Sequence, residues 1–209
     1  MLTVVGNLKG GTGKSTVAFN LAVWLAYDKA GVMAFDLDPQ CTLLDVSEVR
    51  EEDGFEPRFE VSSDLDRLEA MALDKKNRQP IIVDMSATNM PAMEKALSLA
   101  DRVLIPVQPS QADIWSTQRF LKIVNSNINR ENPPEVLGFI NRADTHIGIR
   151  ETDEAEQALE MLQGIKALGL RLYQRTAYRR SFSEGLGVFE LDPMGKASKE
   201  MKKLATMLD

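Results

Sequence analysis

The stretch Lys9-Gly10-Gly11-Thr12-Gly13-Lys14-Ser15-Thr16 decides the fold. It follows a short apolar run at 2–5 and opens a segment, 15–29, whose apolar residues recur at helical spacing. Its glycines allow consecutive backbone N–H groups to turn toward one anion, and the N-terminus of the following helix adds the positive end of its dipole. The stretch therefore predicts a phosphate-binding loop between a first strand and a first helix.

The rest of the chain alternates short apolar runs with helical patterns. The runs are continuous rather than alternating, which is typical of strands buried on both faces, and they lie at 32–35, 81–83, 103–107 and 136–140. Helical patterns follow at 64–77, with Asp64 as N-cap, and at 91–100, 112–127, 151–167 and 193–208. The polar segment 46–63 predicts a loop or irregular insertion. We expect an α/β fold in one domain, 1–209, with a mostly parallel twisted sheet and helices on both faces.

Length and composition exclude several classes of protein. At roughly 150 residues per domain, 209 residues predict one domain that can bury a full core. One cysteine, Cys41, and one histidine, His146, provide neither a disulfide framework nor a structural zinc site. No apolar stretch approaches the roughly 18 residues of a membrane span, and the N-terminus lacks a signal-peptide layout. We expect a cytoplasmic protein without a membrane partner.

Charge is distributed unevenly along the chain. The formal net charge is −6, which argues against a protein that binds nucleic acid over its whole surface. Residues 1–164 carry 16 Lys or Arg and 26 Asp or Glu, whereas residues 165–203 carry nine and four. An acidic body with a basic C-terminal segment predicts a localised anionic partner, and solvated helix faces are the alternative.

The phosphate loop has an unusual form. It carries an early lysine, Lys9, and has Leu8 where the ordinary pattern G-x-x-x-x-G-K-[ST] places glycine. The form K-G-G-x-G-K-[ST] resembles the deviant Walker A motif of the ParA/MinD superfamily, which implies a P-loop NTPase fold and an ATPase that uses ATP and Mg²⁺. By this resemblance, Lys9 crosses a nucleotide-sandwich homodimer to the phosphates of the second copy. The residues expected to bind the nucleotide are Gly10, Gly11, Thr12, Gly13, Lys14, Ser15 and Thr16.

Three carboxylates end strands in the expected order. Asp36-Leu37-Asp38-Pro39-Gln40 is similar to the D-x-D-P-Q motif of the superfamily, and parallel strands deliver such ends to the ligand crevice. The resemblance implies that Asp36 holds Mg²⁺ through water with Ser15, and that Asp38, with Lys9 and Lys14, acts in hydrolysis by orienting or deprotonating the attacking water. The alternative is that Asp38 only caps the turn before Pro39.

The third carboxylate, Asp84, ends a run of Walker B shape and would support the metal from behind its water ligands. Met85-Ser86-Ala87 then departs from the superfamily, which usually has a small residue and prolines there. The stretch 105–110, with Asp113, resembles a segment near the nucleotide and the dimer face. By resemblance, Asn141 contacts the adenine edge and Arg142 packs on the base, unless Arg142 is only a surface arginine.

The basic segment resembles the ParA region that grips DNA phosphates. The residues expected to contact double-stranded DNA without sequence preference are Arg175, Arg179, Arg180, Lys199, Lys202 and Lys203. The superfamily resemblance is to the short ParA type without an N-terminal helix-turn-helix domain, and the opening resembles the McdA-like branch. It implies a nucleoid-associated protein whose hydrolysis is slow until a ParB-like or McdB-like adaptor stimulates it, and whose cargo is a plasmid or a protein body such as a carboxysome.

Two other functions remain open from the residues. One is a MinD-like regulator, because the helix at 193–208 is basic and amphipathic and could lie on a membrane rather than on its own domain. The other is a P-loop biosynthetic enzyme of the dethiobiotin-synthetase or cobyrinic-acid-amidase type, against which Lys9 argues.

Overall fold

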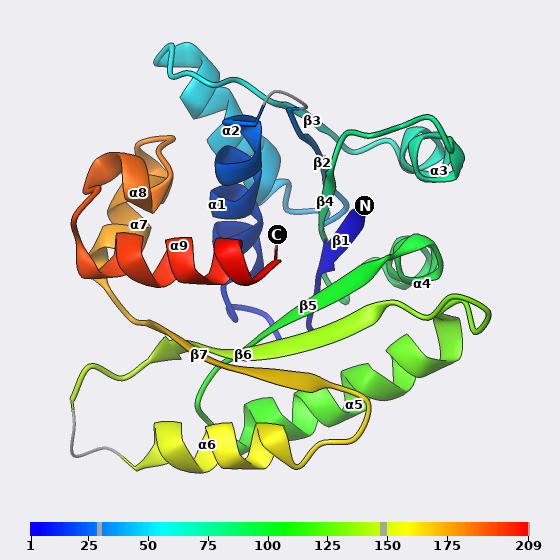
Figure 1. The fold of residues 1–209 in the computed structure, drawn as a ribbon, viewed down its shortest axis with the longest axis vertical. Coiled ribbons are helices and arrows are strands. Elements are labelled where there is room, and N and C mark those ends of the chain that lie inside the picture. The colour runs from blue at the N-terminus through cyan, green and yellow to red at the C-terminus, as the bar shows by residue number, and fades with distance from the viewer. Residues whose placement is uncertain (29–30, 147–149, 209) are drawn as a thin grey trace.

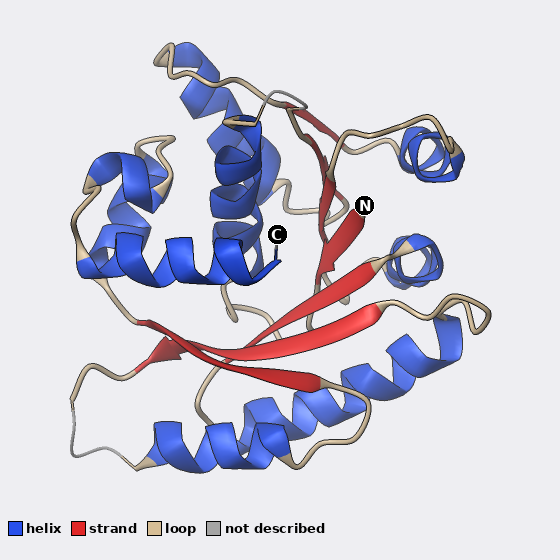
Figure 2. Cartoon of the chain, in the orientation of Figure 1, coloured by secondary structure: helices blue, strands red, loops and turns tan. Residues whose placement is uncertain are grey.

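One twisted parallel sheet lies between two layers of helices (Figures 1 and 2). The computed structural model describes residues 1–28, 31–146 and 150–208. All strand pairs in this part of the chain are parallel, and their order across the sheet is β3-β2-β4-β1-β5-β6-β7. The strands are β1 Leu2–Val5, β2 Met33–Asp36, β3 Glu60–Ser62, β4 Ile81–Asp84, β5 Arg102–Val107, β6 Glu135–Ala143 and β7 Lys166–Tyr173. The predicted α/β fold with a mostly parallel sheet is therefore confirmed.

Each face of the sheet has its own helices and its own apolar core. One face is covered by α1 Lys14–Ala26, α2 Thr42–Glu52, α7 Thr176–Ser183, α8 Val188–Leu191 and α9 Lys196–Leu208. The other face is covered by α3 Leu65–Leu73, α4 Met90–Leu99, α5 Gln111–Asn127 and α6 Glu151–Glu160. Every residue of β1, β2 and β4 is buried, which explains why these strands are continuous apolar runs.

The strand register brings the acidic residues together at one edge of the sheet. β4 pairs with both β1 and β2, and Asp84 lies in register with Val5 on one side and with Asp36 on the other. The phosphate loop follows β1 in the middle of the sheet, and the chain then runs outward on both sides. Ligands of open α/β sheets bind at such a point, outside the carboxyl ends of the strands.

The prediction of a loop at 46–63 is wrong. This segment contains most of α2 and all of β3, which is an edge strand of three residues with exposed or half-buried side chains. The core side of α2 consists of Leu43, Val46 and Arg50. A buried arginine in the place of a third apolar residue made the helix resemble a polar segment.

The prediction of one helix over 151–167 is also wrong at its end. Helix α6 ends at Glu160, Gly164 turns the chain with φ +82°, and β7 begins at Lys166. Helix α3 ends four residues earlier than predicted, whereas Asp64 caps it as expected by accepting from Asp66 N and Arg67 N. Helix α1 is described to Ala26, and the predicted end at residue 29 lies outside the described residues.

The turn between α7 and α8 lies directly against α2. Gly185 has φ +66°, and a Cβ atom added there would lie 2.7 Å from Arg50 N and 2.8 Å from Arg50 Cα. Both atoms belong to a helix backbone, which cannot give way as a flexible side chain can. Gly54 has a similar φ of +71° with no heavy atom within 4 Å of an added Cβ.

This pair separates backbone strain from steric overlap. Gly54→Ala should lower the free energy of unfolding by roughly 1–2 kcal/mol, the usual cost of a left-handed alanine. Gly185→Ala should lower it by more than roughly 3 kcal/mol, because α2 must also move. Urea denaturation of both variants measures the difference, and equal losses would show that the turn yields without resistance.

Candidate nucleotide site

The phosphate loop requires glycine at two positions. Gly11 has φ +76° and Gly13 has φ +89°, and a Cβ atom on Gly13 would lie 2.4 Å from Asn141 Nδ2. Two side chains from neighbouring strands support the loop backbone. Asn141 Nδ2 donates to Thr12 O at 2.6 Å, and Gln108 Nε2 donates to Gly11 O at 2.6 Å. The backbone of the loop is thus held in place by residues of the β5 and β6 segments as well as by α1.

Lys14 lies within this loop rather than in solvent. Its side chain is buried, and Nζ donates to Lys9 O across the loop at 3.2 Å. Burial lowers the pKa of Lys14, while Asp84 and Asp38 act in the opposite direction. An ammonium group in this position binds an anion strongly, because little water competes with it.

Asp36 and Asp38 organise the turn after β2. Asp36 Oδ2 accepts from Leu43 N at 2.8 Å and from Leu44 N at 3.0 Å, so it holds the N-terminus of α2. Asp38 Oδ1 accepts from Gln40 N at 3.0 Å, which is the capping role left open by the sequence. The negative charge of Asp38 also acts to raise the pKa of Lys14, against the effect of burial.

Both carboxylate oxygens of Asp84 are buried and form no hydrogen bond within the part of the chain that the structure describes. Burial raises the pKa of Asp84 to about 7; Asp36 adds to the increase, whereas the Ser15 hydroxyl and Lys14 oppose it. Two bare oxygens beside a serine hydroxyl fit a hydrated Mg²⁺, which prefers oxygen ligands and keeps several waters. Among the described residues, no three His, Cys, Asp or Glu side chains converge as a complete metal cage. Phosphate and water would therefore supply the remaining ligands, with Ser15, Asp36 and Asp84 around them.

Lys9 is held by its own chain. Its Nζ lies 2.5 Å from Asp113 Oδ2, in a pair whose side chains are 40% and 1% exposed, respectively. The Ser110 hydroxyl donates to the same carboxylate, and Asn7 Oδ1 accepts from Lys9 N at 3.2 Å. The sequence placed Asp113 near the nucleotide but did not reveal this ion pair.

A cavity of about 180 Å³ adjoins the phosphate loop. Asn141 and Arg142, which the sequence assigned to the adenine base, line this cavity, and Arg142 adopts φ +57°, a strained value for a residue with a side chain. Tyr178 and Arg179 from α7 line it too, although the sequence assigned Arg179 to DNA. No local sequence pattern connected α7 to this cavity.

The predicted DNA-binding residues differ in their surroundings. Arg175 pairs with Glu200 at 2.6 Å and lies over the Tyr173 ring, and Arg180 pairs with Glu184 at 2.9 Å. Lys202 Nζ donates to Pro193 O at 3.4 Å. Lys199 and Lys203 are exposed on the outer face of α9, together with Lys196, which sequence reasoning missed. Arg179 and Arg180 are exposed as well, but Arg180 is held by Glu184 and Arg179 lines the cavity beside the phosphate loop, so the three lysines of α9 are the exposed cations that share one helix face.

Comparison with known proteins agrees with this geometry. Residues 3–188 match the profile of the CobQ/CobB/MinD/ParA nucleotide binding domain. The chain belongs to this family. It is 27% identical over 201 residues to maintenance of carboxysome distribution protein A of Halothiobacillus neapolitanus, covering 93% of this chain and 89% of that protein. The ParA/MinD members of the family are P-loop ATPases, and the chain is homologous to McdA.

Solved structures of family members share the fold. A Cyanothece McdA variant in complex with ATP has a TM-score of 0.75 at 18% identity, over 99% of this chain and 95% of that one. MinD of Pyrococcus horikoshii with Mg-ADP has a TM-score of 0.72 at 20% identity, over 100% and 95%. The predicted ParA/MinD resemblance is confirmed by these matches and by the family profile.

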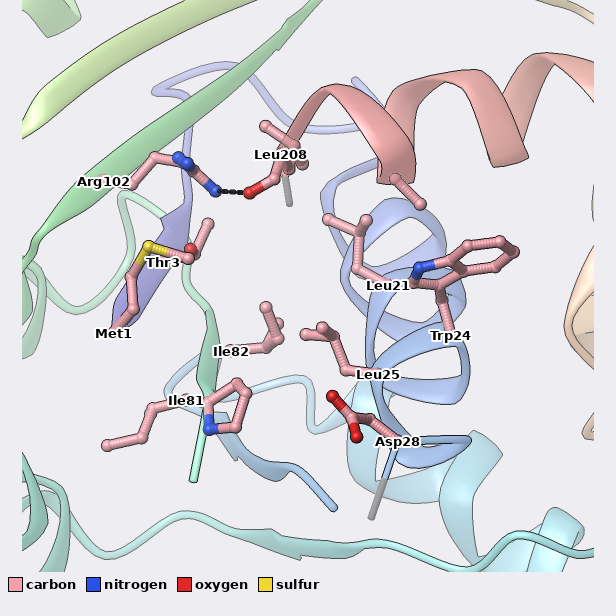
Figure 3. Close-up of a pocket in the computed structure, with 12 residues that line it drawn as sticks. Met1, Thr3, Leu21, Trp24, Leu25, Asp28, Ile81, Ile82, Arg102 and Leu208 are labelled. Atoms are coloured by element: carbon pink, nitrogen blue, oxygen red, sulfur yellow. Dashed lines mark hydrogen bonds between the residues drawn. The ribbon is translucent and has the colours of Figure 1, made fainter. Parts of the chain in front are cut away.

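A second cavity, of about 400 Å³, lies at the amino ends of β1, β4 and β5 (Figure 3). The phosphate loop lies at the opposite, carboxyl ends of the strands. Leu21 and Leu25 of α1, Ile82 of β4 and Leu208 of α9 line it, and Arg102 closes one end by donating to Leu208 O at 2.6 Å. Its place at the amino ends of the strands separates it from the nucleotide chemistry.

No helix in the described part of the chain is long and apolar enough to cross a membrane.

The Asp84 carboxyl should make stability depend on pH when nucleotide and metal are absent. Because its pKa is about 7 in the folded protein and near 3.8 when unfolded, the native state binds the extra proton between these values. This contribution to stability is fully present below the unfolded pKa and is lost as pH rises from there to about 7. Asp84→Asn should therefore be more stable than wild type at pH 8, by up to roughly 4 kcal/mol, and by only about 1 kcal/mol at pH 4.5.

Denaturant titrations of wild type and Asp84→Asn at the two pH values measure this difference. Asp53→Asn, at the exposed turn after α2, is the matched control and should shift neither value. A constant difference between wild type and Asp84→Asn across pH would contradict the assignment.

Proposed function

We propose that this chain is a ParA-type ATPase that dimerises on ATP, binds DNA without sequence preference and positions a cargo with an adaptor that stimulates hydrolysis. The observation that carries the proposal is Lys9. The Lys9 side chain is not needed to hold the phosphate loop together, since Lys14 Nζ already donates to a backbone carbonyl across the loop. The Lys9 side chain lies instead at the exposed side of the site. A second cation there suits a reaction in which charge accumulates on a transferring phosphoryl group.

Hydrolysis in this proposal uses the residues around the loop. Lys14 and Mg²⁺ neutralise the β- and γ-phosphates, and Ser15, Asp36 and Asp84 orient the metal and its waters. Asp38, in the turn that follows β2, orients the attacking water in this proposal. Asn141, Arg142, Tyr178 and Arg179 surround the nucleoside. The Cyanothece McdA complex with ATP supports ATP as the nucleotide, because this chain shares its fold.

Dimerisation would exchange one partner of Lys9 for another. In the single chain the ammonium group lies on Asp113, and in a sandwich dimer it would lie on the phosphates of the second copy. Asp113 is buried and keeps the Ser110 hydroxyl when Lys9 leaves. ATP supplies more negative charge than ADP to draw Lys9 across, so the dimer would form with ATP and dissociate after hydrolysis.

DNA binding is supported by the outer face of α9. Lys196, Lys199 and Lys203 recur at helical spacing, they are exposed, and none forms an ion pair with a residue of the described ranges. Free lysines bind phosphates without reading sequence. Each copy presents a weak patch, and two patches on one dimer bind a duplex far more tightly. DNA binding would thus depend on ATP.

The cargo is proposed from homology. McdA of Halothiobacillus neapolitanus is named for carboxysome distribution, so we propose a protein body of the carboxysome class, with an McdB-like adaptor, ahead of a plasmid with a ParB-like adaptor. A membrane-bound, MinD-like role receives no support from α9. Its apolar residues Met201, Leu204 and Leu208 are buried against the core rather than presented to a lipid surface.

A gel shift on a random-sequence duplex tests the DNA proposal. Wild type should bind with ATP or a non-hydrolysable analogue and not with ADP, and high salt should weaken binding. Lys199→Glu/Lys203→Glu should reduce the affinity at least about tenfold, because each dimer loses four cations. Lys75→Glu/Lys76→Glu, at the exposed turn after α3, makes the same charge change elsewhere and should retain most of the affinity. Equal losses in both variants would show that net charge, not the α9 patch, is responsible.

Asp38→Asn tests the hydrolytic assignment. The amide keeps an oxygen that can accept from Gln40 N, but it cannot take a proton from water. ATP turnover should fall at least about 100-fold while the Kd for ATP changes little. Asp45→Asn, exposed in the first turn of α2, is the control and should turn over ATP like wild type. Comparable activity in the two variants would remove Asp38 from the reaction.

A further inference from the structure

Helix α2 is anchored at both ends. At its N-terminus, the N–H groups of Leu43 and Leu44 donate to Asp36 beside the phosphate loop. At its C-terminal end, Arg50 is only 2% exposed. Its guanidinium pairs with both oxygens of Glu190 in α8, with Nη1–Oε2 at 2.8 Å and Nη2–Oε1 at 2.9 Å. The same side chain donates to Gly185 O at 2.9 Å and to Pro57 O at 3.1 Å.

The far side of this contact is equally constrained. Glu190 also accepts from Gly187 N at 2.7 Å and from the Tyr27 hydroxyl at 2.8 Å, so five segments meet at one carboxylate and one guanidinium. Gly185 lies so close to the α2 backbone that a single Cβ atom would overlap it. Helix α2 therefore cannot shift along its axis without moving the turn that ends α7. A buried bidentate pair of this kind fixes geometry more than it adds stability.

Helix α2 begins at the part of the site where the γ-phosphate, the group that ADP lacks, would bind. Helix α7 already meets the nucleoside cavity through Tyr178 and Arg179, but adenosine is common to both nucleotides. In the proposed function the γ-phosphate binds at the carboxyl ends of β2 and β4, where Asp36 lies in register with Asp84 and caps the N-terminus of α2. Of the two contacts that α7 makes with the site, only the contact through α2 begins beside the phosphate that ATP has and ADP lacks.

We propose that Arg50 is a positioning residue which, through α2, joins the Asp36–Asp38 turn to α7. A γ-phosphate with its Mg²⁺ reorders the Asp36–Asp38 turn, α2 moves as a rigid rod, and the Arg50–Glu190 pair carries that movement to α7 and α8, on which α9 packs. The placement of the basic surface then follows the nucleotide state. The readout by DNA affinity depends on the proposed function, whereas the movement of α7 does not.

The test removes the pair without leaving a buried charge. Arg50→Met/Glu190→Gln keeps an acceptor for Gly187 N and a side chain of similar length at position 50. The control, Arg171→Met/Glu156→Gln, removes another Arg–Glu pair, between β7 and α6, that has no link to α2. For each protein, Kd values for random duplex DNA are measured with an ATP analogue and with ADP. Hydrogen exchange of residues 176–183 is measured in the same two states.

Wild type and the control should bind DNA at least about tenfold more tightly with the ATP analogue and should exchange differently at 176–183 in the two states. In Arg50→Met/Glu190→Gln the affinity ratio should fall to about twofold or less and the exchange difference should vanish, with the Kd for ATP within about twofold of wild type. Arg50→Lys, which keeps the charge but not the bidentate contact, should give an intermediate ratio, and it carries the test if the double variant fails to fold.

Three results have distinct meanings. If wild type binds DNA no better with ATP than with ADP, the proposed DNA function fails, and the exchange measurement alone decides the role of Arg50. If the double variant keeps the exchange difference of wild type, the inference is overturned. If the control loses the difference as well, α7 responds to general loosening of the sheet rather than to α2, which also overturns it.

Discussion

The buried charges around the phosphate loop are the constraint on which the rest of the structure depends. Lys14, Asp36 and Asp84 lie in a region from which water is largely excluded, and among the described residues neither oxygen of Asp84 has a hydrogen-bond partner within standard geometry. A buried carboxylate without a partner is costly, so its pKa rises toward neutrality. The metal and phosphates that we propose would neutralise this cluster. Ligand binding and stability are therefore linked, because a nucleotide that binds only the folded state stabilises it.

In the dimer that we propose, Lys9 would need little rearrangement to change its partner. Its ammonium group has one strong partner in the single chain, the buried carboxylate of Asp113, and it remains exposed enough to leave. The exchange of Asp113 for a phosphate replaces one charge-assisted contact with another, so the difference between the two states is small compared with either contact alone. A small difference suits a reversible switch, since a ligand shifts an equilibrium only by its differential affinity for the two states.

The sequence predicted the parts of the molecule that depend on local pattern. The phosphate loop, the buried central strands and the carboxylates at their ends follow from glycine spacing and continuous apolar runs, and parallel register then places Asp36 beside Asp84. Contacts between distant segments could not be predicted in this way. Lys9 and Asp113 are 104 residues apart, and Arg50 and Glu190 are 140 apart. Helix α2 was not recognised from the sequence, because its core face carries the charged Arg50 at a position where the helical pattern requires an apolar residue.

The assignment of the basic segment shows the same limit at the functional level. Composition correctly marked the C-terminal region as basic, but composition cannot tell a free cation from a paired one. Arg175 and Arg180 are already bound to carboxylates, and a DNA phosphate would have to displace Glu200 or Glu184 to reach them. The gain from such an exchange is small, whereas a solvated lysine on α9 has only counterions and water to release. In a chain of net charge −6, three lysines on one helix face that form no ion pair within the described residues are therefore a stronger basis for proposing a duplex contact than the two arginines held in ion pairs.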